Sequence, residues 1–149
     1  MLTYELERDF NNGRLLELYF HDEVLQNIPI VRILHETQLR RMFGWFACSV
    51  DFLIEFDDGI VLVQCKYKNT RRRENFSIQN FIKSIEVIKS QYKKPFLFGL
   101  WISKLDPFED NKHWLSNHNI HYVSDYQSLD KLIYSAINFI QTQKCTKII

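Results

Sequence analysis

The 149-residue sequence predicts an α/β fold in which a mixed β-sheet is flanked by helices. Two β-rich runs surround an Asp-Gly pair near the middle of the chain, and helical and strand-like patterns alternate after them. Hydrophobic residues make up 46% of the chain, which is enough for a sizeable core. With only four glycines, three prolines and no repeat or linker-like stretch, the pattern favours a single domain over residues 1–149.

The first third of the chain contains a helical pattern over residues 14–26, for which Asn12 is a plausible N-cap. Residues 28–34 are rich in Ile and Val but contain Pro29. This favours an edge strand, because proline cannot donate a hydrogen bond to a neighbouring strand. Residues 35–46 show no pattern that assigns them to a helix or to a strand.

The clearest local signal is a β-hairpin formed by residues 50–56 and 60–67, separated by the Asp-Asp-Gly sequence of residues 57–59. An Asp-Gly pair between two β-rich runs is the strongest short-range hairpin signal. We therefore expect two antiparallel strands joined by a tight turn at Asp58 and Gly59.

The length of this turn fixes which residues face each other across the hairpin. A two-residue turn at Asp58-Gly59 places Asp51 opposite Lys66. The same register sets Leu53 opposite Gln64. A three-residue turn would instead set Asp51 opposite Cys65, so the alternative stays open.

Three further elements follow from periodicity after the hairpin. Residues 75–92 form an amphipathic helical pattern. Residues 96–102 are a nearly all-apolar run of strand length, and residues 120–123 predict a short strand. These elements alternate in the order expected for strands covered by helices.

Two more helices are indicated by their start signals. Asp106 stands as a possible N-cap before Pro107 at the first helical position, which predicts a short helix over residues 106–116. Ser128 is the expected cap of a last helix with a clean apolar stripe over residues 129–140. The predicted order is α, β, β, β, α, β, α, β, α.

Charge is distributed unevenly along the chain although the net charge is only +1. The first 25 residues hold six acids and two bases, whereas residues 66–94 hold nine bases and two acids. This basic stretch can attract a polyanion. The alternative is an ordinary solvated helix face.

The cysteines and the N-terminal sequence bear on the cellular setting. The three cysteines are odd in number and lack CxxC spacing, so we expect reduced thiols and neither disulfides nor a structural zinc site. The N-terminal residues are acidic where a signal peptide is basic and then apolar, and no run of eighteen apolar residues exists. We expect a soluble intracellular protein of the cytoplasm or nucleus, with no membrane partner.

The second strand of the hairpin carries the candidate chemistry. Gln64 and Lys66 are two residues apart and therefore share one face of the sheet, while Cys65 points to the other. Either the strand end emerges into solvent there, or the polar pair lines a site. A third reading is a cross-strand ion pair between Asp51 and Lys66, worth about 0.2–1 kcal/mol.

Asp51, twelve further residues and then Gln64-Cys65-Lys66 resemble the active-site signature of the PD-(D/E)XK, or restriction endonuclease-like, nuclease superfamily. The order of predicted elements over roughly residues 13–141 resembles that fold as well. Val50 stands in place of the nominal proline, and Gln64 in place of the acidic residue. The Gln-Cys-Lys sequence is similar to that of the Holliday junction resolvase and Mrr-like branches.

The resemblance implies a metal-dependent DNA endonuclease that hydrolyses phosphodiester bonds with Mg²⁺ or Mn²⁺. It implies metal ligation by Glu17, Asp51, Gln64 and the backbone carbonyl of Cys65, with Lys66 as the catalytic cation. Glu36 and Glu55 are lesser candidates for the role of Glu17. A neutral Gln64 weakens the expected metal affinity, because hard cations prefer charged oxygen ligands.

The loop after the motif supplies four basic residues for phosphate contact: Lys68, Arg71, Arg72 and Arg73. If this loop is only solvated, the DNA path is expected along Lys83, Lys89, Lys93 and Lys94. We expect a homodimer, since cutting two strands requires two sites, and structure-selective cleavage like that of a junction resolvase or an Mrr-like enzyme. An RNA nuclease and a noncatalytic nucleic-acid-binding or assembly subunit that retains the nuclease fold are the alternatives.

Overall fold

The computed structural model describes residues 2–145 and side chains from Gly13 to Lys144. It forms a five-stranded mixed sheet with the strand order β1-β2-β3-β4-β5. Strands β1, β2 and β3 pair antiparallel, whereas β3, β4 and β5 pair parallel. The elements in chain order are α1 (Leu2–Asn27), β1 (Arg32–His35), α2 (Glu36–Phe43), the 3-10 turn η1 (Trp45–Ala47), β2 (Phe52–Phe56), β3 (Gly59–Lys66), α3 (Asn75–Gln91), β4 (Phe96–Ser103), α4 (Glu109–Asn117), β5 (Ile120–Ser124) and α5 (Leu129–Cys145).

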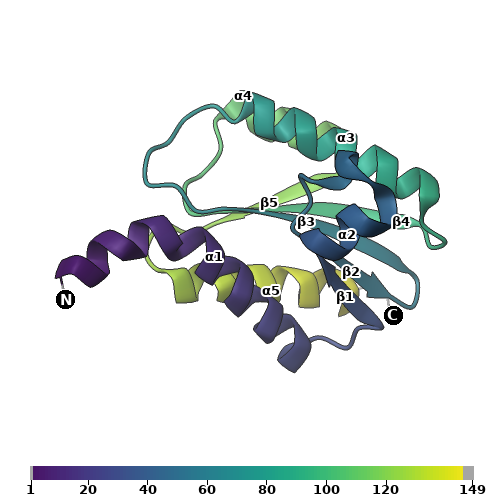
Figure 1. Ribbon diagram of the computed structural model, residues 1–149, viewed down its shortest axis with the longest axis horizontal. Helices are drawn as coiled ribbons and strands as arrows, with labels where there is room; N and C mark the ends of the chain where they lie inside the picture. The colour runs from purple at the N-terminus through teal and green to yellow at the C-terminus, as the bar shows by residue number, and fades with distance from the viewer. Residues whose placement is uncertain (1, 146–149) are drawn as a thin grey trace.

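The helices form two layers around the sheet, which confirms the predicted α/β class. Helices α1 and α5 cover one face, and α3 and α4 cover the other, with α2 and η1 beside α3 (Figure 1). Alternation along β3 divides its side chains between two cores: Val61, Val63 and Cys65 pack toward α1 and α5, and Ile60 and Leu62 toward α3.

Several sequence predictions are confirmed. Helix α3 and strands β4 and β5 lie within one residue of the expected bounds. Ser128 caps α5, because its Oγ accepts a hydrogen bond from the amide of Lys131 at 3.1 Å. Strand β1 is an edge strand, although it spans Arg32–His35 rather than residues 28–34.

Other predictions are wrong. Helix α1 begins at Leu2, so Asn12 lies inside the helix and is not its cap; an internal glycine at position 13 costs only about 1 kcal/mol and does not end it. Helix α4 begins at Glu109 with Phe108 in the N-cap position, not at Asp106. Asp106 instead forms an ion pair with Lys112 at 2.6 Å. Residues 35–46, left unassigned above, contain α2 and the start of η1.

The hairpin exists, but its turn lies one residue earlier than expected. Phe56 pairs with Gly59, so the two turn residues are Asp57 and Asp58. Gly59 belongs to β3, where a Cβ atom would lie 2.6 Å from the carbonyl oxygen of Pro95. The close approach of the segment before β4, and not a turn conformation, therefore requires this glycine. The prediction that Leu53 faces Gln64 is wrong, since Leu53 pairs with Leu62.

Two observations concern the setting of the chain. Across residues 2–145, no helix is both long and apolar enough to cross a membrane. The thiols of Cys48 and Cys65 are free, and Cys65 is buried in the core as expected. Cys145, the third cysteine, has a side chain outside the described ones.

Candidate active site

The candidate site lies beside the first residue of β2. Because β2 starts there, the last residues of β3 have no β2 partner and their edge is uncovered. Strand β2 begins at Phe52, which pairs with Val63. The amide of Asp51 also donates to the carbonyl of Val63, at 2.8 Å, so the ladder is irregular at this point. Asp51 is therefore not opposite Lys66, nor opposite Cys65, and both registers considered above are wrong. The one-residue displacement of the turn is the physical cause.

The side chain of Asp51, and not a backbone carbonyl of β2, accepts the hydrogen bond of β3 at this point. Its Oδ2 accepts a hydrogen bond from the amide of Cys65 at 2.7 Å, and the residue is only 8% exposed. Burial, and then the nearby carboxylate of Glu17, raise the pKa of Asp51 to about 7, while the Cys65 amide and Lys66 act in the opposite direction. Glu36 adds a smaller repulsion. A buried carboxylate beside other carboxylates is a site where a cation would be stabilised.

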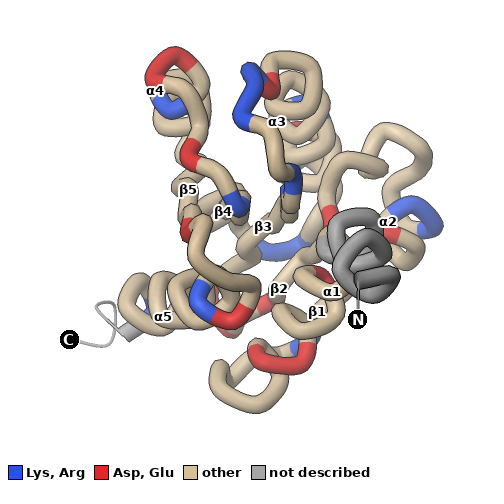
Figure 2. Tube along the Cα trace, turned by 90° about the vertical axis from the view of Figure 1, so that its left-hand side faces the viewer, with Lys and Arg blue, Asp and Glu red and all other residues tan. Residues whose placement is uncertain are grey.

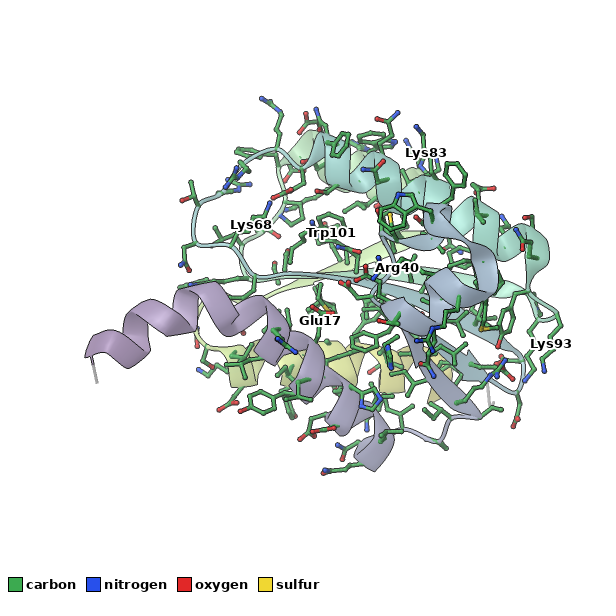
Figure 3. All side chains as sticks on the ribbon, viewed as in Figure 1. Glu17, Arg40, Lys68, Lys83, Lys93 and Trp101 are labelled. Carbon is green, nitrogen blue, oxygen red and sulfur yellow. The ribbon has the colours of Figure 1, made fainter. Side chains whose placement is uncertain are left out.

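Glu17 approaches this carboxylate from helix α1. It rises from α1 toward the sheet, on the side opposite Trp101 (Figure 3). Burial and the charge of Glu36 raise the pKa of Glu17, and Arg14 offsets part of this effect. Glu36, in the first turn of α2, has Arg40 as an ion-pair partner at 3.6 Å. The carboxylates of α1, of α2 and of the segment before β2 are thus electrostatically coupled.

Gln64 and the backbone of Cys65 provide further oxygen atoms. The Oε1 atom of Gln64 is buried and has no hydrogen-bond partner among the described residues. In a β-strand the amide and carbonyl of one residue point toward the same neighbour. Because the Cys65 amide points to Asp51, its carbonyl is directed to the same uncovered edge. Buried oxygen atoms without a hydrogen-bond partner are the kind of ligand that a hard cation such as Mg²⁺ takes.

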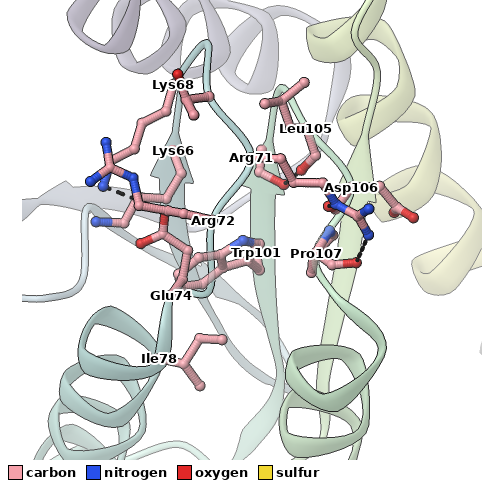
Figure 4. A pocket seen from close by; sticks show the side chains of 12 residues that line it. Lys66, Lys68, Arg71, Arg72, Glu74, Ile78, Trp101, Leu105, Asp106 and Pro107 are labelled. Carbon is pink, nitrogen blue, oxygen red and sulfur yellow. Dashed lines mark hydrogen bonds and ion pairs between the residues drawn. The ribbon is translucent and has the colours of Figure 1, made fainter.

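Lys66 lies at the end of β3, on the side of Trp101. Its Nζ is 6.0 Å from the centroid of the Trp101 ring. Burial and the charge of Lys68 lower the pKa of Lys66, whereas Glu74 and Asp51 raise it. Lys66, Lys68, Arg72 and Trp101 line a pocket between β3, β4 and the loop that leads into α3 (Figure 4).

The basic loop is partly neutralised by contacts within the protein. Arg71 donates to the carbonyls of Asp106 and Pro107 at 2.9 and 3.1 Å. Arg73 forms an ion pair with Asp110 at 2.9 Å. Both side chains therefore fasten the loop to the segment at the start of α4. Figure 2 shows basic positions just before α3 across from acidic positions at the start of α4.

Two cations of this loop have a different position. Lys68 is 3.4 Å from Glu74, and both line the pocket beside Lys66. The guanidinium of Arg72 is exposed and has no ion pair or hydrogen bond among the residues that the structure describes. Lys68 and Arg72 are thus the loop residues best placed to meet a phosphate.

Glu55 lies at the opposite end of β2 from Asp51. It is therefore not placed to take the role of Glu17 as a metal ligand. It is 2% exposed and is paired with Arg32 at 3.1 Å and with Lys94 at 2.8 Å. Burial alone would raise the pKa of Glu55, but hydrogen bonds from Lys94, Tyr92 and Arg32 outweigh it and lower the pKa to about 2. Glu55 is a structural charge that connects β1, β2 and the end of α3.

We expect Glu55→Gln to destabilise the protein by about 3 kcal/mol at neutral pH, because Arg32 and Lys94 lose a buried partner. A group whose pKa is lowered by folding contributes stability above its unfolded pKa, and this is lost as the pH falls through about 2. Urea unfolding as a function of pH measures the effect, with the exposed Glu86→Gln as control. Unchanged stability would contradict this structural role.

Sequence reasoning missed two residues of this region. The Trp101 ring lies beside the Lys66 ammonium, and Glu74 forms an ion pair with Lys68. Alternation along β4 could have placed Trp101 on one face of the sheet. It could not have shown that Trp101 pairs with Gln64, and Ser103 with Lys66, because these pairs depend on the parallel register. Glu74 carried no signal because it stands in a loop.

The described side chains do not assemble a complete metal site of acidic or sulfur ligands. Among the described side chains, no three from His, Cys, Asp or Glu converge closely enough to hold a metal ion. A site here would rely on the Gln64 oxygen and the Cys65 carbonyl in addition to carboxylates. No protein-family model matches the chain, no curated protein matches it, and no solved structure matches it.

Proposed function

We propose that this protein is a metal-dependent DNA endonuclease with a restriction endonuclease-like core. One observation carries the proposal: the buried Asp51 carboxylate accepts the Cys65 amide at the open edge of β3, and the preceding residue, Gln64, has a buried Oε1 without a partner among the described residues. The signature resemblance and the order of an antiparallel β1-β2-β3 unit followed by parallel β4 and β5 support it. Structure-selective cleavage by a homodimer, similar to that of junction resolvases or Mrr-like enzymes, is part of the same proposal.

The residues at this edge would hold Mg²⁺ or Mn²⁺ through Asp51, Glu17, Gln64 and the Cys65 carbonyl. When bound, the cation supplies Lewis-acid activation of the phosphodiester and of the attacking water. Asp51 has a pKa near 7 without the cation, so it must lose a proton to act as a ligand. Metal affinity is therefore expected to rise with pH through this range.

Lys66 would supply the positive charge of the site. Its ammonium is half-buried beside the Trp101 ring, where a positive charge is screened less than in water. It therefore stabilises the negative charge that develops on the phosphate oxygens during hydrolysis. Burial also lowers its pKa, which eases proton transfer with the attacking water.

The test is a cleavage assay on plasmid, single-stranded, flap and four-way-junction DNA with Mg²⁺ or Mn²⁺. We expect hydrolysis of at least one of these substrates, lost on chelation of the metal. The alternative is a noncatalytic nucleic-acid-binding or assembly subunit that retains this fold, favoured by the neutral Gln64. Tight DNA binding without cleavage under every metal condition would support that alternative, and cleavage of RNA alone would correct the substrate class.

The basic loop gives a prediction about DNA affinity. Arg72→Ala should reduce the slope of log K against log salt by about 0.9, the value for one phosphate contact on B-DNA. Lys68→Ala, Arg71→Ala and Arg73→Ala should reduce it less, because Lys68 is already paired with Glu74 and the two arginines with the α4 segment. Binding titrations at several salt concentrations measure these slopes. Wild-type slopes for Lys68→Ala and Arg72→Ala would move the DNA path to Lys83, Lys89, Lys93 and Lys94.

A further inference from the structure

Two large aromatic side chains stand exposed on the 3-10 turn η1. Trp45 and Phe46 are 71% and 73% exposed, although their neighbour Ala47 is fully buried. Consecutive exposed aromatic residues on an ordered turn are unusual, because each leaves a large apolar surface in water. These two side chains therefore do not stabilise the core and are available to bind another molecule.

The backbone holds this turn in place. The Phe46 carbonyl accepts a hydrogen bond from the Ser84 hydroxyl of α3 at 2.6 Å. Gly44, with φ of 85°, ends α2 in the left-handed region that favours glycine, and the Cys48 amide closes η1 on the Trp45 carbonyl at 3.1 Å. The aromatic rings are thus presented from a fixed support rather than from a free loop.

The surroundings of these rings are basic. Helices α2 and α3 together carry four cations and two acids. The guanidinium of Arg40 lies 5.4 Å from the Trp45 ring, and Arg41 and Lys83 are exposed and have no ion-pair partner among the described residues. Figure 3 labels Arg40 on α2 and Lys83 on α3, the two helices that η1 contacts. Exposed aromatic rings among cations are the arrangement that binds unpaired nucleotides.

This surface leads directly to the candidate site. Asp51 is five residues after Phe46, so the two are separated by at most roughly 18 Å of chain. The Val50 amide donates to the Ala47 carbonyl at 3.4 Å, so a single turn of the chain connects η1 to Asp51. A strand held on Trp45 and Phe46 would therefore lie within reach of the Asp51 carboxylate.

We propose that Trp45 and Phe46, with Arg40, Arg41 and Lys83, form a stacking surface for unpaired bases of the DNA strand that enters the site. The preferred substrate is then DNA with a single-stranded segment beside the cleavage point. This inference rests on the proposed nuclease function for its substrate, but binding can be measured apart from cleavage.

The test is fluorescence anisotropy of a labelled thymidine oligonucleotide and of a blunt duplex, with the full chain and EDTA present. The double variant Trp45→Ala, Phe46→Ala should lose affinity for the single strand by roughly 10- to 100-fold. Its affinity for the duplex should change by less than about threefold, and Trp45→Phe should retain most single-strand binding because a phenyl ring still stacks. The matched control is Tyr126→Ala, Tyr134→Ala, which removes two aromatics that are 72% and 73% exposed elsewhere.

Single-strand affinity equal to that of the wild type, or an equal loss for both DNAs, would overturn the inference. Unchanged DNA binding together with altered sedimentation would also overturn it, and would identify the surface as a protein interface. Selective loss of single-strand binding supports it even if no substrate is cleaved, in which case only the nuclease proposal fails. If the wild type cleaves DNA and the double variant binds single strands normally, the nuclease proposal stands and the stacking surface is wrong.

Discussion

Asp51→Asn should abolish DNA cleavage, reducing the rate by about 100- to 1,000-fold or more, while the protein stays folded. Asparagine keeps an oxygen that can accept the Cys65 amide, which is 2.7 Å from Asp51 Oδ2. It removes the negative charge by which Asp51 would attract a hard cation. Asp51→Ala is a poorer test, because it leaves that buried amide without a partner at a cost of about 1–3 kcal/mol.

Lys66→Met should have a loss of similar size, since it keeps the apolar stem over Trp101 but removes the ammonium. Single-turnover cleavage and urea unfolding of the same preparations separate catalysis from stability. Lys131→Met, on the exposed face of α5, is the control. Wild-type cleavage in either site variant would remove that residue from the active site.

The same cleavage assay applies to Glu17→Gln, for which we expect an intermediate rate. We expect a partial loss of activity that high Mn²⁺ recovers in part, because one of several ligands is weakened. Full activity at low metal concentration would transfer the role to Glu36, the other acid that acts on Asp51.

The second large effect is on stability as a function of pH. Folding raises the pKa of Asp51 from 3.8 to about 7, so the folded state holds a proton that the unfolded chain has released. The associated stability is fully present below about pH 4 and is lost as the pH rises through about 7. This shift corresponds to roughly 4 kcal/mol.

We therefore expect the metal-free wild type to lose stability relative to Asp51→Asn between about pH 4 and pH 7. Urea unfolding with EDTA measures both proteins over this range, and most other titrations cancel in the difference. Above about pH 7, saturating Mg²⁺ should raise the unfolding free energy of the wild type and not that of Asp51→Asn. A constant difference across the range would mean that Asp51 is an ordinary solvated carboxylate.

The type and order of most elements could be predicted from the sequence alone. Periods of 2 and 3.6 residues identified the hairpin, α3, β4, β5 and α5 within one or two residues at most ends, because side-chain burial on one face repeats with the backbone geometry. Alternation likewise separated Gln64 from the buried Cys65. The start of α1, the cap of α4 and the helix α2 were not found, since their signals were weak or contradicted by local residues.

The geometry of the site depends on contacts between residues that are far apart in the sequence. Gly59 is required in β3 by the close approach of Pro95, which no local pattern records. The raised pKa of Asp51 depends first on burial and then on the charge of Glu17, which belongs to α1. The pairing of Arg71 with Asp106 and Pro107 likewise spans more than thirty residues. Local patterns record burial, whereas desolvation and charge coupling arise from neighbours that the folded chain brings together.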